Sequence, residues 1–331
     1  MTDDDDKLAP RERGWSRELG RNGIPSTAIA LGLAALGRPG YLTLGHGDDF
    51  ADHSVEAMAA RTHEVLDAAY EAGIRHFDAA RSYGRAEEFL GSWLRSRSVQ
   101  PGSLTISSKW GYRYTAGWRV QADPQEVKEL TAENFRRQLE ETREQLGEYL
   151  SLYQIHSATL SSGVLDDRDV RAGLDALRAQ GVAIGLSLSG TEQGATIERA
   201  MQIGGFDTVQ ATWNLLERSA GSALQSAHEA GIGVMIKEAL ANGRLTSRGE
   251  TEPLARAAGR LGVTEDALAI AAVLARPWVD VVLSGASTVA QLESNLVATR
   301  VHWDAALEDE LAPLTEPPDD YWETRSALPW T

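Results

Sequence analysis

The chain has 331 residues, of which 42% are hydrophobic, and its formal net charge is −16 at pH 7. A chain of this length suits one large barrel or two ordinary domains. The acidic balance argues against nucleic acid and anionic membranes as partners, because both recruit basic patches. Since the sequence contains no cysteine, disulfides, thiolate metal sites and cysteine nucleophiles are excluded.

We expect a cytoplasmic protein with a single folded domain. No secretory hydrophobic region opens the chain, and its most apolar helical run, residues 267–275, is too short to cross a bilayer. Residues 1–14 include the run DDDDK at 3–7, which is typical of an enterokinase site. They are predicted to be a disordered acidic N-terminal segment or the remnant of an expression tag. Residues 15–331 contain no low-complexity linker and are predicted to form one domain.

The predicted elements begin with a hairpin, a strand and a helix. Residues 15–25 (WSRELGRNGIP) are typical of a β-hairpin with an Asn-Gly turn. Residues 28–33 form an apolar strand, and the Gly- and Asp-rich residues 37–54 are interpreted as a solvated crossover. A helix with clear amphipathic spacing follows at residues 55–72. Its apolar face comprises Met58, Thr62, Val65, Leu66 and Ala69.

A short buried strand and the loop after it carry the first candidate site residues. The strand is apolar at Ile74 and Phe77, and Asp78 lies where the strand should end. Tyr83 follows in the loop, before a helix at residues 85–94. The apolar side of that helix comprises Phe89, Leu90, Trp93 and Leu94.

Two further strands end in polar residues that are able to do chemistry. One strand, at 104–109, ends in a lysine, and the other, at 150–156, ends in a histidine. The helix between them is predicted at 132–146, with Thr131 as its N-cap and Gly147 as its stop. Its inner stripe comprises Phe135, Leu139, Thr142 and Leu146.

The remaining chain alternates between helices and strands until the pattern weakens beyond Asn295. A helix is predicted at 169–179, and strands are predicted at 182–187, 208–213, 232–236 and 279–283. Three prolines are then expected to break any helix: Pro313, Pro317 and Pro318. The aromatic tail contains Tyr321, Trp322 and Trp330. Two interpretations of this tail stay open, that it covers a substrate site or that it packs on the side of the barrel.

A loop rich in aromatic residues follows Lys109. Exposed aromatic residues in such a loop expose apolar surface to water unless they line a pocket. Packing against the barrel rim is the alternative to a pocket role. We predict that this loop contacts substrate. The candidate substrate-binding residues are Trp110, Tyr112 and Trp118.

Four residues, Asp78, Tyr83, Lys109 and His156, lie in this order at or just after the ends of three strands. In a barrel of parallel strands the loops that follow the strands carry function, so these side chains are expected to converge. Their order and spacing resemble the catalytic tetrad of the aldo-keto reductase family, and the resemblance extends over residues 15–300. It implies an α/β fold, a (β/α)8 TIM barrel whose bottom is capped by the N-terminal hairpin.

The resemblance also implies an NAD(P)-dependent oxidoreductase. Such an enzyme transfers a hydride between nicotinamide and the carbonyl or alcohol group of a small-molecule aldehyde, ketone or sugar. Tyr83 is then the general acid/base, because carbonyl reduction needs an acid for the developing alkoxide. Lys109, paired with Asp78, is expected to lower the pKa of Tyr83. A neutral His156 is expected to donate a hydrogen bond to the substrate oxygen.

The family's cofactor contacts map onto two groups of positions and three single residues. The resemblance assigns cofactor binding to Ser187, Gln210, Trp213, Lys237, Leu240, Asn242, Gly243, Arg244, Gly285, Ser287, Gln291 and Asn295. At two places the sequence departs from the family pattern. Leu188 replaces the asparagine that normally follows Ser187, and Lys237 replaces an aromatic residue that normally stacks on nicotinamide.

The implied cofactor is NADP, and NAD is not excluded. Residues 284–295 contain no Lys or Arg, so no cation in this segment neutralises a 2′-phosphate. Arg244 is the candidate to do so from the other side of the site. No metal site is predicted, because His46 and His53 lie in a loop without convincing ligand spacing.

Two other functions stay open at this point. The departures at Leu188 and Lys237 are compatible with a biosynthetic reductase of an unusual C=O, C=N or conjugated C=C group. The family also includes cofactor-binding regulatory subunits of potassium channels, which keep the tetrad. Turnover of a carbonyl panel would distinguish an enzyme from such a subunit. The sequence leaves the substrate, the physiological direction and the oligomeric state open.

Overall fold

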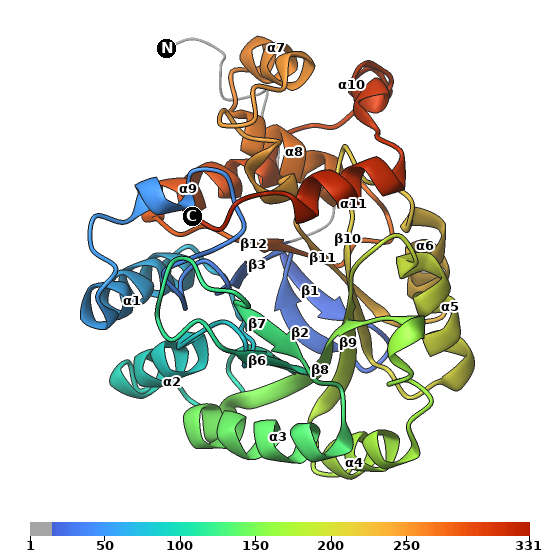
Figure 1. The fold of residues 1–331 in the computed structure, drawn as a ribbon. Helices are drawn as coiled ribbons and strands as arrows, with labels where there is room; N and C mark the ends of the chain where they lie inside the picture. The colour runs from blue at the N-terminus through green and yellow to red at the C-terminus, as the bar shows by residue number, and fades with distance from the viewer. Residues whose placement is uncertain (1–14) are drawn as a thin grey trace.

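Eight parallel strands form a closed barrel in this computed structural model, which describes residues 15–331. The prediction for residues 1–14 lies outside the described residues. Around the barrel the strands follow one another in chain order, and the last pairs with the first, which confirms the TIM barrel (Figure 1). The strands are β3 Ile29–Gly32, β4 His76–Asp78, β5 Thr105–Trp110, β8 Leu150–Ala158, β9 Ala183–Leu188, β10 Thr208–Thr212, β11 Gly233–Lys237 and β12 Val281–Ser284.

Helices surround this barrel, and several of them pack directly on its strands (Figure 1). The main ones are α1 Val55–Glu71, α2 Ala86–Ser96, α3 Ala132–Leu146, α4 Arg168–Arg178, α5 Gln193–Ile203, α6 Gly221–Glu229, α7 Glu252–Leu261, α8 Glu265–Leu274, α9 Val289–Val297, α10 Ala305–Leu311 and α11 Pro318–Ser326. Every residue of the predicted face of α1 is buried. The N-cap of α3 is Thr131, whose hydroxyl accepts a hydrogen bond from the Asn134 amide at 3.2 Å. Within residues 15–331 no helix combines the length and the hydropathy that a membrane span needs.

The N-terminal hairpin closes the bottom of the barrel. Its strands are β1 Ser16–Leu19 and β2 Ile24–Thr27. The Leu19 side chain packs in the barrel interior at this end, in contact with a cluster that comprises Ala30, Leu152, Met235 and Val281. Gly20, at φ 61°, lies so close to β11 that an added Cβ would be 2.7 Å from the Gly233 nitrogen. Only glycine satisfies both the backbone conformation and this close approach.

The C-terminal tail contains a helix that the prolines were predicted to prevent. Helix α11 begins at Pro318 itself, and Pro317 is its N-cap. That prediction was wrong because proline is tolerated in the first helical turn, where its missing N–H has no partner to lose. Figure 1 shows α11, in red, lying over the ends of β10 and β11. Its Tyr321 hydroxyl accepts a 3.0 Å hydrogen bond from the Asn214 amide, which holds the helix there.

A neutral histidine is buried in the barrel wall below the site. His76 has no exposed surface, and its two ring nitrogens lie 3.0 Å from the hydroxyls of Ser26 and Ser107. Burial lowers the pKa of His76 to about 4. The unfolded chain therefore binds a proton near pH 6.5 that the folded protein does not accept until about pH 4.

We expect the contribution of His76 to the free energy of unfolding to be fully present above pH 6.5 and to be lost as the pH falls from 6.5 to about 4. With 1.36 kcal/mol per pKa unit, His76 alone accounts for on the order of 3 kcal/mol. Urea unfolding at several pH values measures the slope. The variant His76→Gln, which keeps groups able to bond both serines, should show a shallower slope. An unchanged slope would assign the acid sensitivity to other groups.

Candidate active site

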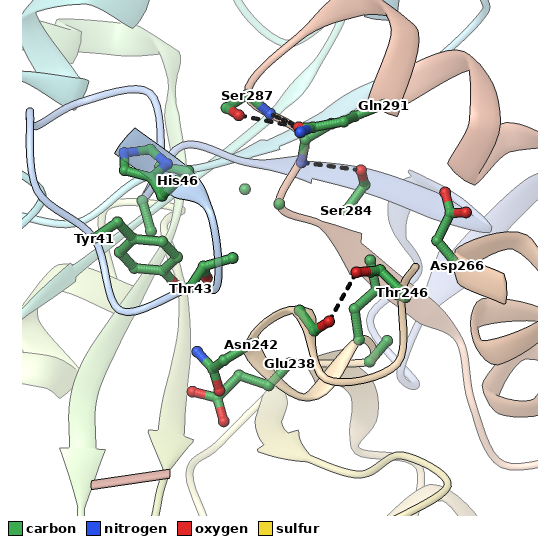
Figure 2. Close-up of a pocket in the computed structure, with 18 of the residues that line it drawn as sticks. Tyr41, Thr43, His46, Glu238, Asn242, Thr246, Asp266, Ser284, Ser287 and Gln291 are labelled. Atoms are coloured by element: carbon green, nitrogen blue, oxygen red, sulfur yellow. Dashed lines mark hydrogen bonds between the residues drawn. The ribbon is translucent and has the colours of Figure 1, made fainter. Parts of the chain in front are cut away.

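A cavity of about 780 Å³ opens at the C-terminal ends of the strands. Its volume is in the range of small-molecule and cofactor sites. Its position is the one at which barrel enzymes carry their active sites. Figure 2 shows a close-up, with side chains from the loops after β3, β11 and β12 facing one another. The four predicted catalytic residues lie at its inner end.

Two adjacent strands bring Asp78 and Lys109 together. β4 and β5 are parallel neighbours in which Asp78 pairs with Ser107, and Lys109 lies two residues further along the same face of β5. The Lys109 ammonium donates hydrogen bonds to the Asp78 carboxylate and, at 3.0 Å, to the Ala79 carbonyl. Both side chains are buried, so this ion pair is shielded from solvent.

The remaining two members of the tetrad lie directly above this pair. The Tyr83 hydroxyl is 3.5 Å from the Lys109 ammonium nitrogen. The rings of Tyr83 and His156 meet edge to face, with centroids 5.5 Å apart. Tyr112 packs on the other side of His156, at 5.0 Å between centroids. Asp78, Tyr83 and His156 line the cavity, whereas Lys109 lies beneath its surface.

The pKa of Tyr83 moves in the opposite direction to the one expected from the sequence. Burial raises it above its ordinary value, and the negative charge of Asp78 raises it further. Arg38 lowers the pKa of Tyr83 but does not overcome these effects. Lys109 was expected to favour the phenolate, but its charge is already paired with Asp78. Tyr83 is therefore a protonated group at neutral pH, ready to donate.

His156 is neutral at physiological pH. Burial lowers its pKa well below the ordinary value, and the positive charges of Lys109 and Lys237 lower it further. Its Nδ1 lies 3.4 Å from the Ser82 hydroxyl. A neutral imidazole in this place keeps one N–H that can donate to an oxygen in the cavity.

A second charged cluster lines the cavity at the end of β11. The Lys237 ammonium donates a 2.9 Å hydrogen bond to the Thr212 hydroxyl and lies 3.5 Å from the Glu238 carboxylate. Glu238, at φ 54°, accepts a forked contact from Arg325 of α11. Burial lowers the pKa of Lys237 to about 8, although Glu238 raises it in part. Lys237 thus lines the cavity, but as a held cation and not as a stacking ring.

Two predicted tryptophans point away from the cavity because strand side chains alternate. On β5, Lys109 faces the barrel interior, so its neighbour Trp110 faces the helices and packs on Phe135. On β10, Gln210 faces the interior, and Trp213 lies on the opposite side against Trp278. The predicted substrate contact of Trp110 and the predicted cofactor contact of Trp213 are therefore wrong.

Three more predicted residues lie outside the cavity surface. Trp118 packs on Phe89, and its indole N–H donates to the His53 carbonyl at 2.7 Å. Arg244 pairs with Glu316 and does not line the cavity. The Ser187 hydroxyl accepts a 2.9 Å hydrogen bond from the backbone amide of Ser157. Ser157 and Ser189 line the cavity in its place.

The other predicted cofactor residues do line the cavity, and they suit a nucleotide. They are Gln210, Lys237, Leu240, Asn242, Gly243, Gly285, Ser287, Gln291 and Asn295, and Tyr112 lines it as well. An added Cβ at Gly285 would meet only open space, so backbone and ligand can approach closely there. Ser287 and Gln291 supply polar groups on one side of the cavity, and Asn242 supplies them on the facing side (Figure 2). These features fit an extended polar ligand such as a dinucleotide.

The loop after β3 and the C-terminal tail together cover the cavity, and the sequence prediction missed the part that the loop plays. Residues of the loop 37–54, including Arg38 and Asp49, line the cavity, so this loop is not a solvated crossover. Tyr41 exchanges backbone hydrogen bonds with Thr331, and Trp330 also lines the cavity. The tail therefore covers the site. The position of the loop directly after a barrel strand was the signal available in the sequence.

Comparison with known proteins was decisive for the family. The sequence pattern that defines the "Aldo/keto reductase family" matches residues 29–307. The chain belongs to this family. This aldo/keto reductase is therefore an oxidoreductase of the nicotinamide-dependent kind.

Individual relatives have low sequence identity to this chain, and the share of the chain that each one aligns with differs. An uncharacterized oxidoreductase, YrpG of Bacillus subtilis, is 25% identical and the alignment covers 94% of this chain and 98% of that protein. The aldo-keto reductase str7 of Strobilurus tenacellus is 29% identical over an alignment that covers 37% of this chain and 32% of that protein. In structure, the aldo-keto reductase AKR11C1 from Bacillus halodurans matches 92% of this chain and 97% of its own, with TM-score 0.71 and 19% identity.

Proposed function

We propose that this aldo/keto reductase reduces the carbonyl group of a small molecule, with Tyr83 as the general acid. The observation that supports this most is the position of the Tyr83 hydroxyl. It lies 3.5 Å from the ammonium of Lys109, which is itself paired with Asp78, and next to the ring of His156. An acid, its electrostatic support and a hydrogen-bond donor thus meet at one point of one cavity.

A nicotinamide cofactor, when bound, supplies the hydride for this reaction. The chain's own residues handle the substrate oxygen. Neutral His156 donates a hydrogen bond to the carbonyl oxygen and orients it towards Tyr83. The Tyr83 O–H gives its proton to that oxygen as negative charge develops there. The nearby Lys109 ammonium then stabilises the phenolate that is left, and Asp78 keeps the lysine in place.

The substrate side of the cavity is aromatic and covered. Tyr112, Trp330 and the guanidinium of Arg38 line it close to the tetrad, and Arg38 stacks over the Trp330 ring at 4.8 Å. Such a lining suits a small aldehyde, ketone or sugar whose reacting end is held by polar groups. It also limits water near the reacting carbon.

The test is multiple turnover with a panel of aldehydes, ketones and sugars, monitored by the loss of reduced-nicotinamide absorbance. Both NADH and NADPH are tried with every compound, and the reverse reaction is tried with the matching alcohols. We expect at least one class of carbonyl to be reduced over many cycles. Cofactor binding without turnover on any compound would contradict an enzymatic role and favour the regulatory-subunit alternative.

A further inference from the structure

The proposed function defines what lies at each end of the cavity. Because Tyr83 must protonate the oxygen of the same carbonyl group whose carbon receives the hydride, the nicotinamide end of a dinucleotide has to lie near Tyr83. The adenosine end then has to lie at the opposite end of the cavity. That outer end is formed by the short 3-10 helix η2 His46–Asp49, the loop after β11 and the start of α9. Ser287 and Gln291 mark it in Figure 2.

A carboxylate of the chain itself occupies the hydrogen-bond donors of this outer end. Asp49 Oδ2 accepts hydrogen bonds from the Ser287 hydroxyl at 3.0 Å and from the Gln291 amide at 2.9 Å. The same carboxylate forms an ion pair with Arg248, whose Nη1 lies 3.3 Å from Oδ2. Both residues at the start of α9 and the cation opposite them are thus already bound to one anion.

The chain holds Asp49 and Arg248 in this arrangement from several sides. Arg248 also donates a 3.0 Å hydrogen bond to the Leu44 carbonyl. Gly45, at φ 69°, lets the arginine side chain cross its backbone, because an added Cβ would be 2.9 Å from Arg248 Cδ. Burial works against ionisation of Asp49, but the hydrogen bonds from Arg248, Gln291 and Ser287 outweigh it and hold its pKa below the ordinary value.

The outer end of the cavity is negative overall. Among the described residues that line it, Arg248 is the one cation and pairs with Asp49, and the carboxylates of Glu265 and Asp266 line the cavity as well. Figure 2 shows Asp266 on the same side as Ser284 and Gln291. Burial lowers the pKa of His46 to about 4, so this histidine adds no positive charge at neutral pH.

We propose that Asp49 selects a dinucleotide whose adenosine ribose carries a free 2′-hydroxyl, so that this protein binds NADH in preference to NADPH. The proposal rests on the proposed oxidoreductase function. A hydroxyl can donate to the Asp49 carboxylate, as acidic residues do for the ribose of NAD in other folds. A 2′-phosphate brings a charge of about −1.5 to −2 against that carboxylate and finds its donors occupied.

Titration of each cofactor by fluorescence tests this without any turnover. In the wild-type protein NADH should bind at least about tenfold more tightly than NADPH, which corresponds to about 1.4 kcal/mol. The variant Asp49→Asn keeps the shape and one acceptor oxygen but removes the charge. This variant should lower the ratio of the NADPH Kd to the NADH Kd by about tenfold, mainly because NADPH binds more tightly. Adding Arg248→Met to that variant should remove the gain in affinity for NADPH, because this gain comes from the Arg248 side chain that Asp49 no longer pairs with.

Asp48→Asn is the matched control. Asp48 is the exposed neighbour of Asp49 and does not line the cavity, so it makes the same change in net charge without the contacts. Its Kd ratio should stay within about twofold of the wild type, because exposed charges are screened. Tighter wild-type binding of NADPH, or an unchanged ratio in Asp49→Asn, would overturn the role of Asp49. Failure of both dinucleotides to bind would instead overturn the proposed function, and this inference with it.

Discussion

Replacing Tyr83 with phenylalanine should lower kcat by roughly 10²–10⁴ while leaving the Kd of the reduced cofactor nearly unchanged. The substitution removes the only O–H that lies both at the tetrad and next to Lys109 among the described residues. It keeps the ring, which packs edge to face on His156. Cofactor titration and steady-state kinetics on the best carbonyl of the panel measure the two quantities separately.

Tyr112→Phe provides the comparison for this variant. Tyr112 also lines the cavity and packs on His156, at 5.0 Å between ring centroids, but Lys109 does not support its hydroxyl. Loss of that hydroxyl should therefore change kcat by less than about tenfold, the cost of an ordinary hydrogen bond. Equal losses in the two variants would show that the cavity needs any tyrosine hydroxyl, and the specific role of Tyr83 as acid would be lost.

Replacing Lys109 with methionine should destabilise the protein by about 3–5 kcal/mol, because it leaves a buried carboxylate without its counter-charge. Lys109 and Asp78 are both almost fully buried. The hydrogen bonds that Asp78 also accepts, from Ser107 at 2.7 Å and from Gln154 at 3.3 Å, do not supply a charge. The free energy of unfolding in urea measures the loss, and catalysis should be lost as well.

A second substitution identifies the cause of that loss. Adding Asp78→Asn to Lys109→Met removes the stranded charge while keeping an acceptor for the neighbouring donors, so most of the lost stability should return. Arg256→Met, which breaks an exposed i,i+4 pair with Glu252, should cost less than about 0.5 kcal/mol. If the double variant is as unstable as Lys109→Met, the lost packing of the lysine stem is responsible rather than the unpaired charge.

Local sequence patterns predicted the elements and placed candidate polar residues at the strand ends. The apolar spacing of α1 and the cap at Thr131 predicted helices that match the structure within a residue or two. These features depend on contacts between residues three or four apart, which a linear pattern records directly. The same holds for Asp78 and Lys109, since the ends of successive parallel strands meet at one rim.

The direction of individual side chains was less accessible from the sequence. Trp110 and Trp213 each follow a residue whose side chain faces the barrel interior, so the alternation along the chain turns both tryptophans outward. The direction of the Tyr83 pKa shift failed for a related reason. The pairing of Lys109 with Asp78 was predicted, but the burial of Tyr83 is a property of the folded site, and the spacing of the residues does not show that it outweighs the effect of nearby cations on the pKa.

From the sequence came the individual strands and helices, which follow from short-range periodicity, while the closed barrel and its capping hairpin were implied by the resemblance to the family. Only the tertiary structure decided which of the two arginines Arg244 and Arg248 lines the cavity. Arg244 is drawn away by Glu316, 72 residues distant in the chain, while Arg248 meets Asp49, 199 residues distant. Contacts across such separations depend on how the loops meet after the barrel closes. These contacts fix the charge at the outer end of the cavity, on which the proposed preference for NADH rests.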